Sequence, residues 1–199
     1  KHWSCLDLGC GYGNFLAYLR AKGISEFVGI DTSADAIAAA NKEFGETRVQ
    51  HRDAFEFLVA HKNSFDLISA LDFIEHVTKD ELYDLLDKTL NALKPGGLLL
   101  LRTPNANGLF GMAARYNDIT HEVCFTPGSI ADVLHGGGFN VRAIWEDTGK
   151  PTSVMQLAQC LAWLSTRFVI RCVNAAETGS WGDGVLTRNM WILAGKPIG

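Results

Sequence analysis

The sequence Asp7-Leu8-Gly9-Cys10-Gly11-Tyr12-Gly13, with three glycines in seven residues, lies near the start of this 199-residue chain. It separates a short apolar run, residues 3–8, from a segment with apolar residues at helical spacing, residues 14–21. Glycines permit a tight turn that a ligand can approach closely, and the N-terminus of the following helix offers unpaired N–H groups. The dinucleotide-binding fingerprint does not fit, because Asn14 stands where a third small residue is needed. The stretch therefore predicts a ligand-binding turn between a strand and a helix.

Short apolar runs alternate with helical patterns along the rest of the chain. The expected strands are 3–8, 27–30, 48–51, 65–70, 98–101, 140–145 and 190–194, the last two antiparallel to each other. The expected helices are 14–21, 34–44, 54–60, 78–93, 127–135 and 153–173. Such alternation predicts an α/β fold with a mostly parallel sheet and helices on both faces. Ligands then bind beyond the carboxyl ends of the strands.

Composition and charge limit the classes of partner. Hydrophobic residues make up 47% of the chain and charged residues 20%, which is typical of a folded globular protein. The net charge of −4 offers no basic face for nucleic acid. Five cysteines without a CxxC pair argue against a zinc site or a disulfide framework, so we expect a cytoplasmic location. Asp7 interrupts the first apolar run too early for a signal peptide.

From the glycine stretch onward, the chain resembles class I S-adenosylmethionine-dependent methyltransferases. The resemblance continues with Asp31 after the second strand, Asp53-Ala54 after the third, and Leu93-Lys94-Pro95-Gly96-Gly97 before the fifth. It covers residues 3–145 well. It implies a Rossmann-like seven-stranded sheet over a single domain, residues 1–199, with S-adenosylmethionine as methyl donor and S-adenosylhomocysteine as product.

Under this resemblance, the strand tips bind the methyl donor. The Asp31 carboxylate can accept hydrogen bonds from both ribose hydroxyls. The alternative role for Asp31, as a helix-cap acid, is less expected because Ser33 already caps the following helix. Asp53 can accept from the adenine amino group, with an N-cap role as the alternative, and Ile30 or Phe55 can pack on the adenine. The expected donor-binding residues are Asp7, Gly9, Cys10, Gly11, Gly13, Asp31, Thr32, Asp53, Ala54, Leu71 and Asp72.

Two histidines are candidates for acceptor chemistry. The pattern Asp72-x-x-Glu75-His76 and the pair Thr120-His121 are both similar to sugar and quinone O-methyltransferases. An alcohol acceptor must lose a proton, and histidine is the usual base near neutral pH. We expect His121, oriented by Asp118 or Glu122, to be the base, with His76 as the alternative. A loop histidine that only bonds the backbone is equally open for His121.

The favoured function is methylation of a hydroxyl group on a sugar or related small molecule. Two alternatives stay open: N- or C-methylation of a metabolite such as a quinone precursor, and a cofactor-binding scaffold without catalysis. No (N/D)PPY-type motif is present, so amino groups of DNA or glutamine are not expected acceptors. Asp72, Glu75 and His76 would suit Mg²⁺ or Mn²⁺, but their loose spacing leads us to expect no metal site.

Residues 153–173 form a dense apolar helical pattern inside an insertion at about 150–185. Their length would nominally span a bilayer. Gln156, Gln159, Arg167 and Arg171 argue against a transmembrane span. We expect a helix used for packing or for self-association as a homodimer. The alternative is peripheral membrane contact or a hydrophobic wall for a lipid-linked substrate.

Overall fold

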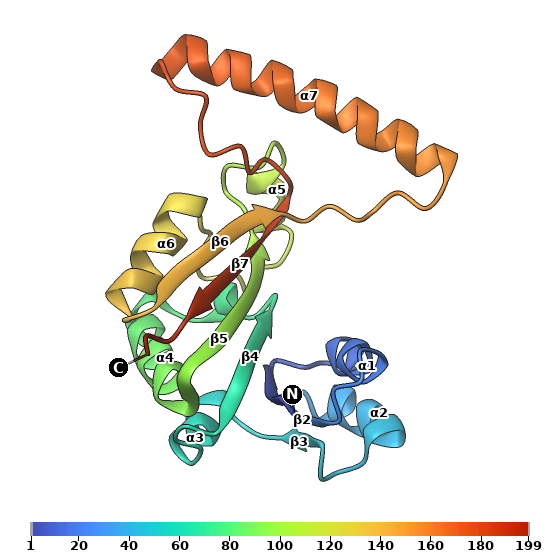
Figure 1. Ribbon diagram of the computed structural model, residues 1–199, viewed down its shortest axis with the longest axis vertical. Helices are drawn as coiled ribbons and strands as arrows, with labels where there is room; N and C mark the ends of the chain where they lie inside the picture. Colours follow the sequence, from blue (N-terminus) through green and yellow to red (C-terminus); the bar gives the residue numbers. More distant parts are fainter. Residues whose placement is uncertain (1, 199) are drawn as a thin grey trace.

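The computed structural model describes residues 2–198 and contains one seven-stranded sheet of order β3-β2-β1-β4-β5-β7-β6 (Figure 1). All neighbouring strands are parallel except β7, which is antiparallel to β5 and β6. The strands are β1 (Ser4–Leu8), β2 (Glu26–Asp31), β3 (Val49–His51), β4 (Phe65–Leu71), β5 (Leu93–Pro104), β6 (Asn140–Glu146) and β7 (Asn189–Gly195). The predicted Rossmann-like fold class is confirmed.

The helices begin and end mostly where local signals predict them. They are α1 (Asn14–Ala21), α2 (Ala34–Phe44), α3 (Ala54–Val59), η1 (Ile74–His76), α4 (Lys79–Ala92), α5 (Gly111–Tyr116), α6 (Pro127–Gly136) and α7 (Val154–Thr178). The Ser33 side chain accepts a hydrogen bond from the Ala36 N–H at the start of α2, and Thr78 and Glu81 form the predicted capping box of α4.

Two hydrophobic clusters, one with each set of helices, pack against the sheet. Leu58 of α3, Leu86 of α4 and Ile130 of α6 belong to one cluster. Leu16 of α1 and Ile37 of α2 belong to the other. Full burial of a leucine or isoleucine side chain contributes about 1.5–3 kcal/mol to the free energy of unfolding. Burial in these two clusters therefore stabilises the packing of the helices against the sheet.

The structure departs from the sequence-based expectation around β5. This strand begins at Leu93, which pairs with Phe65, and its register then shifts before Leu98. Pro95 fits here because β7 pairs with β5 only from Leu98 onward, so no ladder N–H is needed on that side. The six-residue helix α5 was not expected either, since six residues are too few to show a helical period.

Helix α7 lies beyond the end of the sheet where β5 and β6 terminate, in the connection between β6 and β7 (Figure 1). It spans 25 residues, five more at its C-terminal end than predicted, and none of its residues is buried. Ser153 caps it by accepting a hydrogen bond from the Gln156 N–H at 3.2 Å. Within residues 2–198, no helix has the length and apolar character needed to cross a membrane.

Candidate active site

The glycine turn after β1 has a backbone that only glycine adopts easily. Gly9 and Gly13 have φ values of 67° and 81°. A Cβ atom at Gly9 would lie 2.7 Å from a ring carbon of Phe73, and one at Gly13 would lie 2.6 Å from a ring carbon of Phe44. The glycines are therefore required both by conformation and by close packing of two aromatic rings.

Asp31 at the tip of β2 holds the turn in place. One carboxylate oxygen accepts a hydrogen bond from the Gly11 N–H at 2.8 Å, and the other accepts from the Ser33 N–H at 2.7 Å. An ionised carboxylate offers about four lone-pair positions, so further hydrogen bonds remain available. Asp31 can therefore fix the turn and still bind the hydroxyls of a ribose.

A cavity of about 280 Å³ opens beside this turn, and we call it the glycine-loop cavity. Its lining residues are Gly9, Ile30, Asp31, Thr32, Arg52, Ala54, Asp72, Phe73 and His76. It brings together five of the predicted donor-binding residues and the apolar Ile30. No sequence pattern singled out Arg52 or Phe73, because their positions depend on the packing of separate segments.

The other predicted donor-binding residues are not among the residues that line the glycine-loop cavity. Asp53 caps α3, with one oxygen accepting from the N–H groups of Phe55 and Glu56 at 2.9 and 3.1 Å. This is the N-cap role that the sequence left open, and Asp53 is outside the lining. The remaining predicted residues, which also lie outside the lining, are Asp7, Cys10, Gly11, Gly13 and Leu71.

Asp7 is buried at the end of β1 and accepts a 2.6 Å hydrogen bond from the Ser69 hydroxyl. Burial raises the pKa of Asp7 to about 7, the Ser69 hydrogen bond lowers it in part, and the nearby charge of Asp31 raises it further. A cationic group placed near this carboxyl group would favour its charged form.

One carboxylate and two imidazole side chains lie close together at the edge of the glycine-loop cavity that His76 lines. Glu75, His76 and His121, which we call the Glu–His–His cluster, each offer a ligand-type atom, and these atoms lie within 4.8 Å of one another. The two imidazole rings make an edge contact with centroids 4.8 Å apart. Glu75 is only 1% exposed, and burial raises its pKa to about 7. The cluster has the residue types of a divalent-cation site.

Backbone hydrogen bonds join the two segments that carry the cluster. The N–H groups of Glu122 and Val123 donate to the Glu75 carbonyl at 2.8 and 3.2 Å. In the Glu75 side chain, Oε2 accepts a hydrogen bond from the Thr103 hydroxyl at 3.0 Å. The loop with His121 is thus fastened onto η1, although more than 40 residues separate the two in sequence.

The predicted orientation of His121 by Asp118 or Glu122 is wrong for the described structure. The Asp118 carboxylate accepts instead from the Thr120 hydroxyl at 2.7 Å, and that hydroxyl lies 2.9 Å from Nδ1 of His76. Glu122 contacts the cluster only through its backbone. Asp118 therefore acts through Thr120 on His76, because the loop turns the side chain of Asp118 toward its own backbone.

Arg102 links the glycine-loop cavity to a second one. It bonds Asp72, which lines the glycine-loop cavity, and its Nε donates to the Asp147 carboxylate at 2.8 Å. Asp147 lines a cavity of about 470 Å³ under α7, which we call the α7 cavity. The sequence signal for this role was one arginine directly after four leucines of a buried strand. Its partners lie 30 and 45 residues away and could not be assigned from the sequence.

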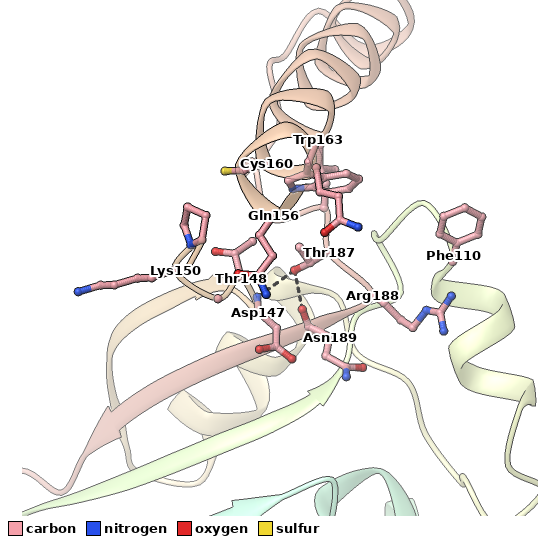
Figure 2. Close-up of a pocket in the computed structure, with 14 residues that line it drawn as sticks. Phe110, Asp147, Thr148, Lys150, Gln156, Cys160, Trp163, Thr187, Arg188 and Asn189 are labelled. Atoms are coloured by element: carbon pink, nitrogen blue, oxygen red, sulfur yellow. Dashed lines mark hydrogen bonds between the residues drawn. The ribbon is translucent and has the colours of Figure 1, made fainter. Parts of the chain in front are cut away.

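The α7 cavity lies between the inner side of α7 and the start of β7 (Figure 2). Gln156 and Trp163 of α7 lie across it from Thr187 and Asn189, and Cys160 also lines it. The Thr187 hydroxyl donates to the Asn189 carbonyl at 2.6 Å, which fixes the floor. The indole N–H of Trp163 is buried and has no hydrogen-bond partner within the described residues. The cavity thus combines amide groups, an aromatic ring and an unused donor.

Comparison with known proteins places these features in a family. A family model described as a methyltransferase domain matches residues 1–144. The ubiquinone biosynthesis O-methyltransferase of Bradyrhizobium sp. (strain ORS 278) is 35% identical over 104 residues, covering 51% of this chain and 40% of that protein. The corresponding protein of Chelativorans sp. (strain BNC1) is 34% identical over 118 residues, covering 56% and 46%. The chain spans less than half the length of either curated relative.

Solved structures confirm the fold. A SAM-dependent methyltransferase from Archaeoglobus fulgidus superposes with a TM-score of 0.69 at 23% identity, covering 98% of this chain and 86% of that one. The [4+2]-cyclase SpnF superposes with a TM-score of 0.63 at 22% identity, covering 100% and 76%. A shared fold therefore does not by itself fix the reaction. The family match over residues 1–144 shows that the chain belongs to the methyltransferase-domain family, and the solved structures show that it has the class I fold.

Proposed function

We propose that the chain transfers the methyl group of S-adenosylmethionine to a hydroxyl group of a small molecule. The observation that carries this proposal is the position of His76, which lines the glycine-loop cavity and also contacts His121. A hydroxyl acceptor must lose its proton as it is methylated, whereas an amine attacks with a free lone pair. A histidine pair at the cavity edge supplies the group that this loss requires.

The residues around the glycine-loop cavity are suited to the adenosine part of the donor. Asp31 has free acceptor capacity for the ribose, Ile30 offers an apolar surface for adenine, and the Ala54 N–H is available at the start of α3. Asp7 and the Leu71 carbonyl are proposed to face the methionine ammonium. When bound, S-adenosylmethionine supplies an activated methyl group on its sulfonium. The chain therefore mainly has to align donor and acceptor.

The α7 cavity is proposed to receive the remainder of the acceptor. Most of its lining surface is apolar, and Asp147, Gln156 and Asn189 supply the polar groups that would bind the hydroxyls of a sugar or a similar polyhydroxylated molecule. A phenolic quinone precursor is the second candidate, because the curated relatives are ubiquinone biosynthesis O-methyltransferases. The apolar ring of Trp163 on the same wall would pack against either one.

Labelled donor with two acceptor panels tests the proposal. The protein is incubated with methyl-labelled S-adenosylmethionine and either dihydroxybenzoates or sugars and sugar nucleotides, and products are identified by mass spectrometry. Label on an oxygen atom of one panel is the expected result. Label on nitrogen or carbon, or donor binding without turnover on any acceptor, contradicts it.

Histidine variants then test the site. Loss of a positioned proton acceptor typically costs about 10²–10⁴-fold in rate, so His121→Ala and His76→Ala should lose about that much turnover. Affinity of His121→Ala for S-adenosylhomocysteine should stay nearly constant, because His121 does not line the glycine-loop cavity. His135→Ala, an exposed histidine at the end of α6, is the matched control and should keep full turnover. If both cluster variants also keep full turnover, the acceptor is an amine or a thiol.

A further inference from the structure

The Glu–His–His cluster contains two buried polar atoms without a partner. Within the described residues, neither Oε1 of Glu75 nor Nδ1 of His121 has a hydrogen-bond partner. The Glu75 side chain is 1% exposed, so water does not replace the missing partner from the surface. Burying a carboxylate oxygen and an imidazole nitrogen unpaired is costly, and such groups normally find a proton donor or a metal ion.

Hydrogen bonds around His76 show which of its nitrogens is free. Nδ1 of His76 faces the Thr120 carbonyl at 3.3 Å and the Thr120 hydroxyl at 2.9 Å. A carbonyl only accepts, and the single proton of that hydroxyl already goes to Asp118 at 2.7 Å. Nδ1 therefore carries the proton, and the lone pair of a neutral His76 is on Nε2. This Asp118–Thr120–His76 chain is the outer support that metal-binding histidines commonly have.

We propose that Glu75, His76 and His121 bind one divalent transition-metal cation, such as Zn²⁺ or Mn²⁺, at the edge of the glycine-loop cavity. Two imidazoles and one carboxylate suit these cations, whereas Mg²⁺ and Ca²⁺ prefer oxygen ligands throughout. Ligand atoms about 2.1 Å from a common ion lie about 3–4 Å apart. The present limit of 4.8 Å closes through side-chain rotation, because His76 is exposed and His121 half-buried.

The bound cation changes how the proposed reaction loses its proton, and this step rests on the proposed function. Three protein ligands leave a coordination position for the acceptor oxygen. A hydroxyl bound to a divalent cation has a lowered pKa and releases its proton to solvent. The oxygen then forms a bond to the methyl carbon while the carbon–sulfur bond breaks, and sulfur keeps the electron pair. The histidines act as ligands in this form of the site.

Metal titration tests the site without any acceptor. The full chain is treated with a chelator, which is then removed, and ZnCl₂, MnCl₂ or MgCl₂ is titrated by calorimetry. We expect one Zn²⁺ or Mn²⁺ per chain with a Kd of about 10 µM or tighter, and Mg²⁺ at least tenfold weaker. Metal analysis after gel filtration checks the stoichiometry. Zn²⁺ affinity no tighter in the wild type than in Glu75→Gln overturns the proposal.

Four variants separate ligands from neighbours. Glu75→Gln and His121→Ala each remove a ligand and should weaken Zn²⁺ binding by more than about 100-fold. Thr120→Val removes the hydroxyl behind His76 and should weaken it about 10–100-fold. Glu122→Gln removes an adjacent exposed charge and should change nothing. Circular dichroism and S-adenosylhomocysteine affinity show that each variant is folded. His121→Ala decides the result if the buried Glu75 variant fails to fold.

The same preparations distinguish failure of this site from failure of the proposed function. Turnover that survives complete metal removal, together with absent Zn²⁺ binding, overturns the metal site and leaves the histidine pair as proton acceptor. Stoichiometric Zn²⁺ binding without O-methylation of any acceptor supports the site and contradicts the proposed function. Turnover lost on chelation and restored by Zn²⁺ or Mn²⁺, but not in Glu75→Gln, supports both.

Discussion

Asp31 has two roles at the residue scale, and they compete for one carboxylate. Its hydrogen bonds to the Gly11 and Ser33 N–H groups order the glycine turn and the start of α2. The same group is proposed to bind the donor ribose. Removing it therefore disturbs both the shape of the turn and a direct charge-assisted contact, and both effects act on donor binding.

Asp31→Ala should weaken S-adenosylhomocysteine binding about ten- to hundredfold, which corresponds to a loss of about 1.5–3 kcal/mol. Calorimetric titration of the folded variant provides the measurement. Asp35→Ala, an exposed aspartate in the first turn of α2, is the matched control and should bind normally. Unchanged affinity in a folded Asp31→Ala protein would remove Asp31 from the donor site.

Asp7 predicts a pH dependence of stability. Its pKa in the folded chain is raised to about 7 by burial, whereas an unfolded aspartate titrates near about 3.9. Between these values, the unfolded chain has released a proton that the folded chain keeps. Stability contributed by Asp7 therefore falls as pH rises from about 4 to about 7, and is constant above that.

Asp7→Asn removes this dependence and still accepts the Ser69 hydrogen bond. The Tm of Asp7→Asn minus the Tm of the wild type should be larger at pH 8 than at pH 5, by at least about 2 °C. For a chain of this size, a Tm shift of about 2 °C corresponds to a change of about 0.5–1 kcal/mol in the free energy of unfolding. Thermal unfolding at both pH values provides the measurement. An equal Tm difference at the two pH values contradicts the assigned pKa shift.

At the scale of elements, local signals were enough for α2 and α4, whose caps and bounds follow from Ser33 and Thr78. The Glu–His–His cluster could be predicted only in part. The sequence singled out its three members, but the backbone bonds that fasten residues 122–123 to Glu75 cross more than 40 residues. Such contacts depend on tertiary packing, and this is also why Arg102 was missed.

Helix α7 exposes an apolar seam that predicts self-association. Val154, Leu157, Leu161, Leu164 and Phe168 follow one another at intervals of three and four residues, and each is at least 50% exposed. This is the spacing of a coiled-coil seam, which packs against another helix. No charged residue falls in this seam. The chain has one helix of this kind among its described residues, so a second copy is the expected partner.

The two arginines of α7 argue against binding to an anionic membrane. Arg167 donates to the Gly184 carbonyl at 3.0 Å and pairs with Glu146, and Arg171 donates to the Trp181 carbonyl at 3.1 Å. Both thus turn toward the rest of the chain. A helix that lies on a membrane normally presents such cations to the lipid headgroups.

Sedimentation equilibrium of the wild type at micromolar concentration should therefore give a dimer, and Leu161→Glu should give a monomer, because it places a charge in the middle of the seam. Val59→Glu changes an exposed apolar residue of α3 and should leave the dimer intact. A wild-type monomer at about 100 µM contradicts the prediction. Flotation of that monomer with phospholipid vesicles would instead assign the seam to a membrane surface.

At the scale of the whole molecule, the chain consists of a sheet that is proposed to bind the donor and an insertion that is proposed to shape the acceptor site. The parallel pairing of β1 to β5 was predictable because helices alternate with these strands, and a helical crossover is what joins parallel neighbours. The position of α7 over the end of the sheet was not, since a long insertion has no such rule. Its inner side forms a wall of the α7 cavity, yet none of its residues is buried (Figure 2).

Replacing residues 150–184 by a four-residue turn tests this division. β6 and β7 are already paired in register from Glu146 and Met190 inward, and a hairpin connection needs only a few residues. The core loses no buried side chain, since Val185 is retained. The variant should unfold cooperatively, with a Tm within about 5 °C of the wild type. It should also bind S-adenosylhomocysteine with unchanged affinity.

Methylation of the identified acceptor should fall by at least about 100-fold in the same variant, because the wall that carries Gln156 and Trp163 is gone. The double variant Gln156→Ala/Trp163→Ala keeps the helix and should reproduce most of that loss, mainly as a raised KM. A shortened chain that does not fold would show that α7 belongs to the core. A shortened chain that folds, binds the donor and methylates at the full rate would place the acceptor outside the α7 cavity.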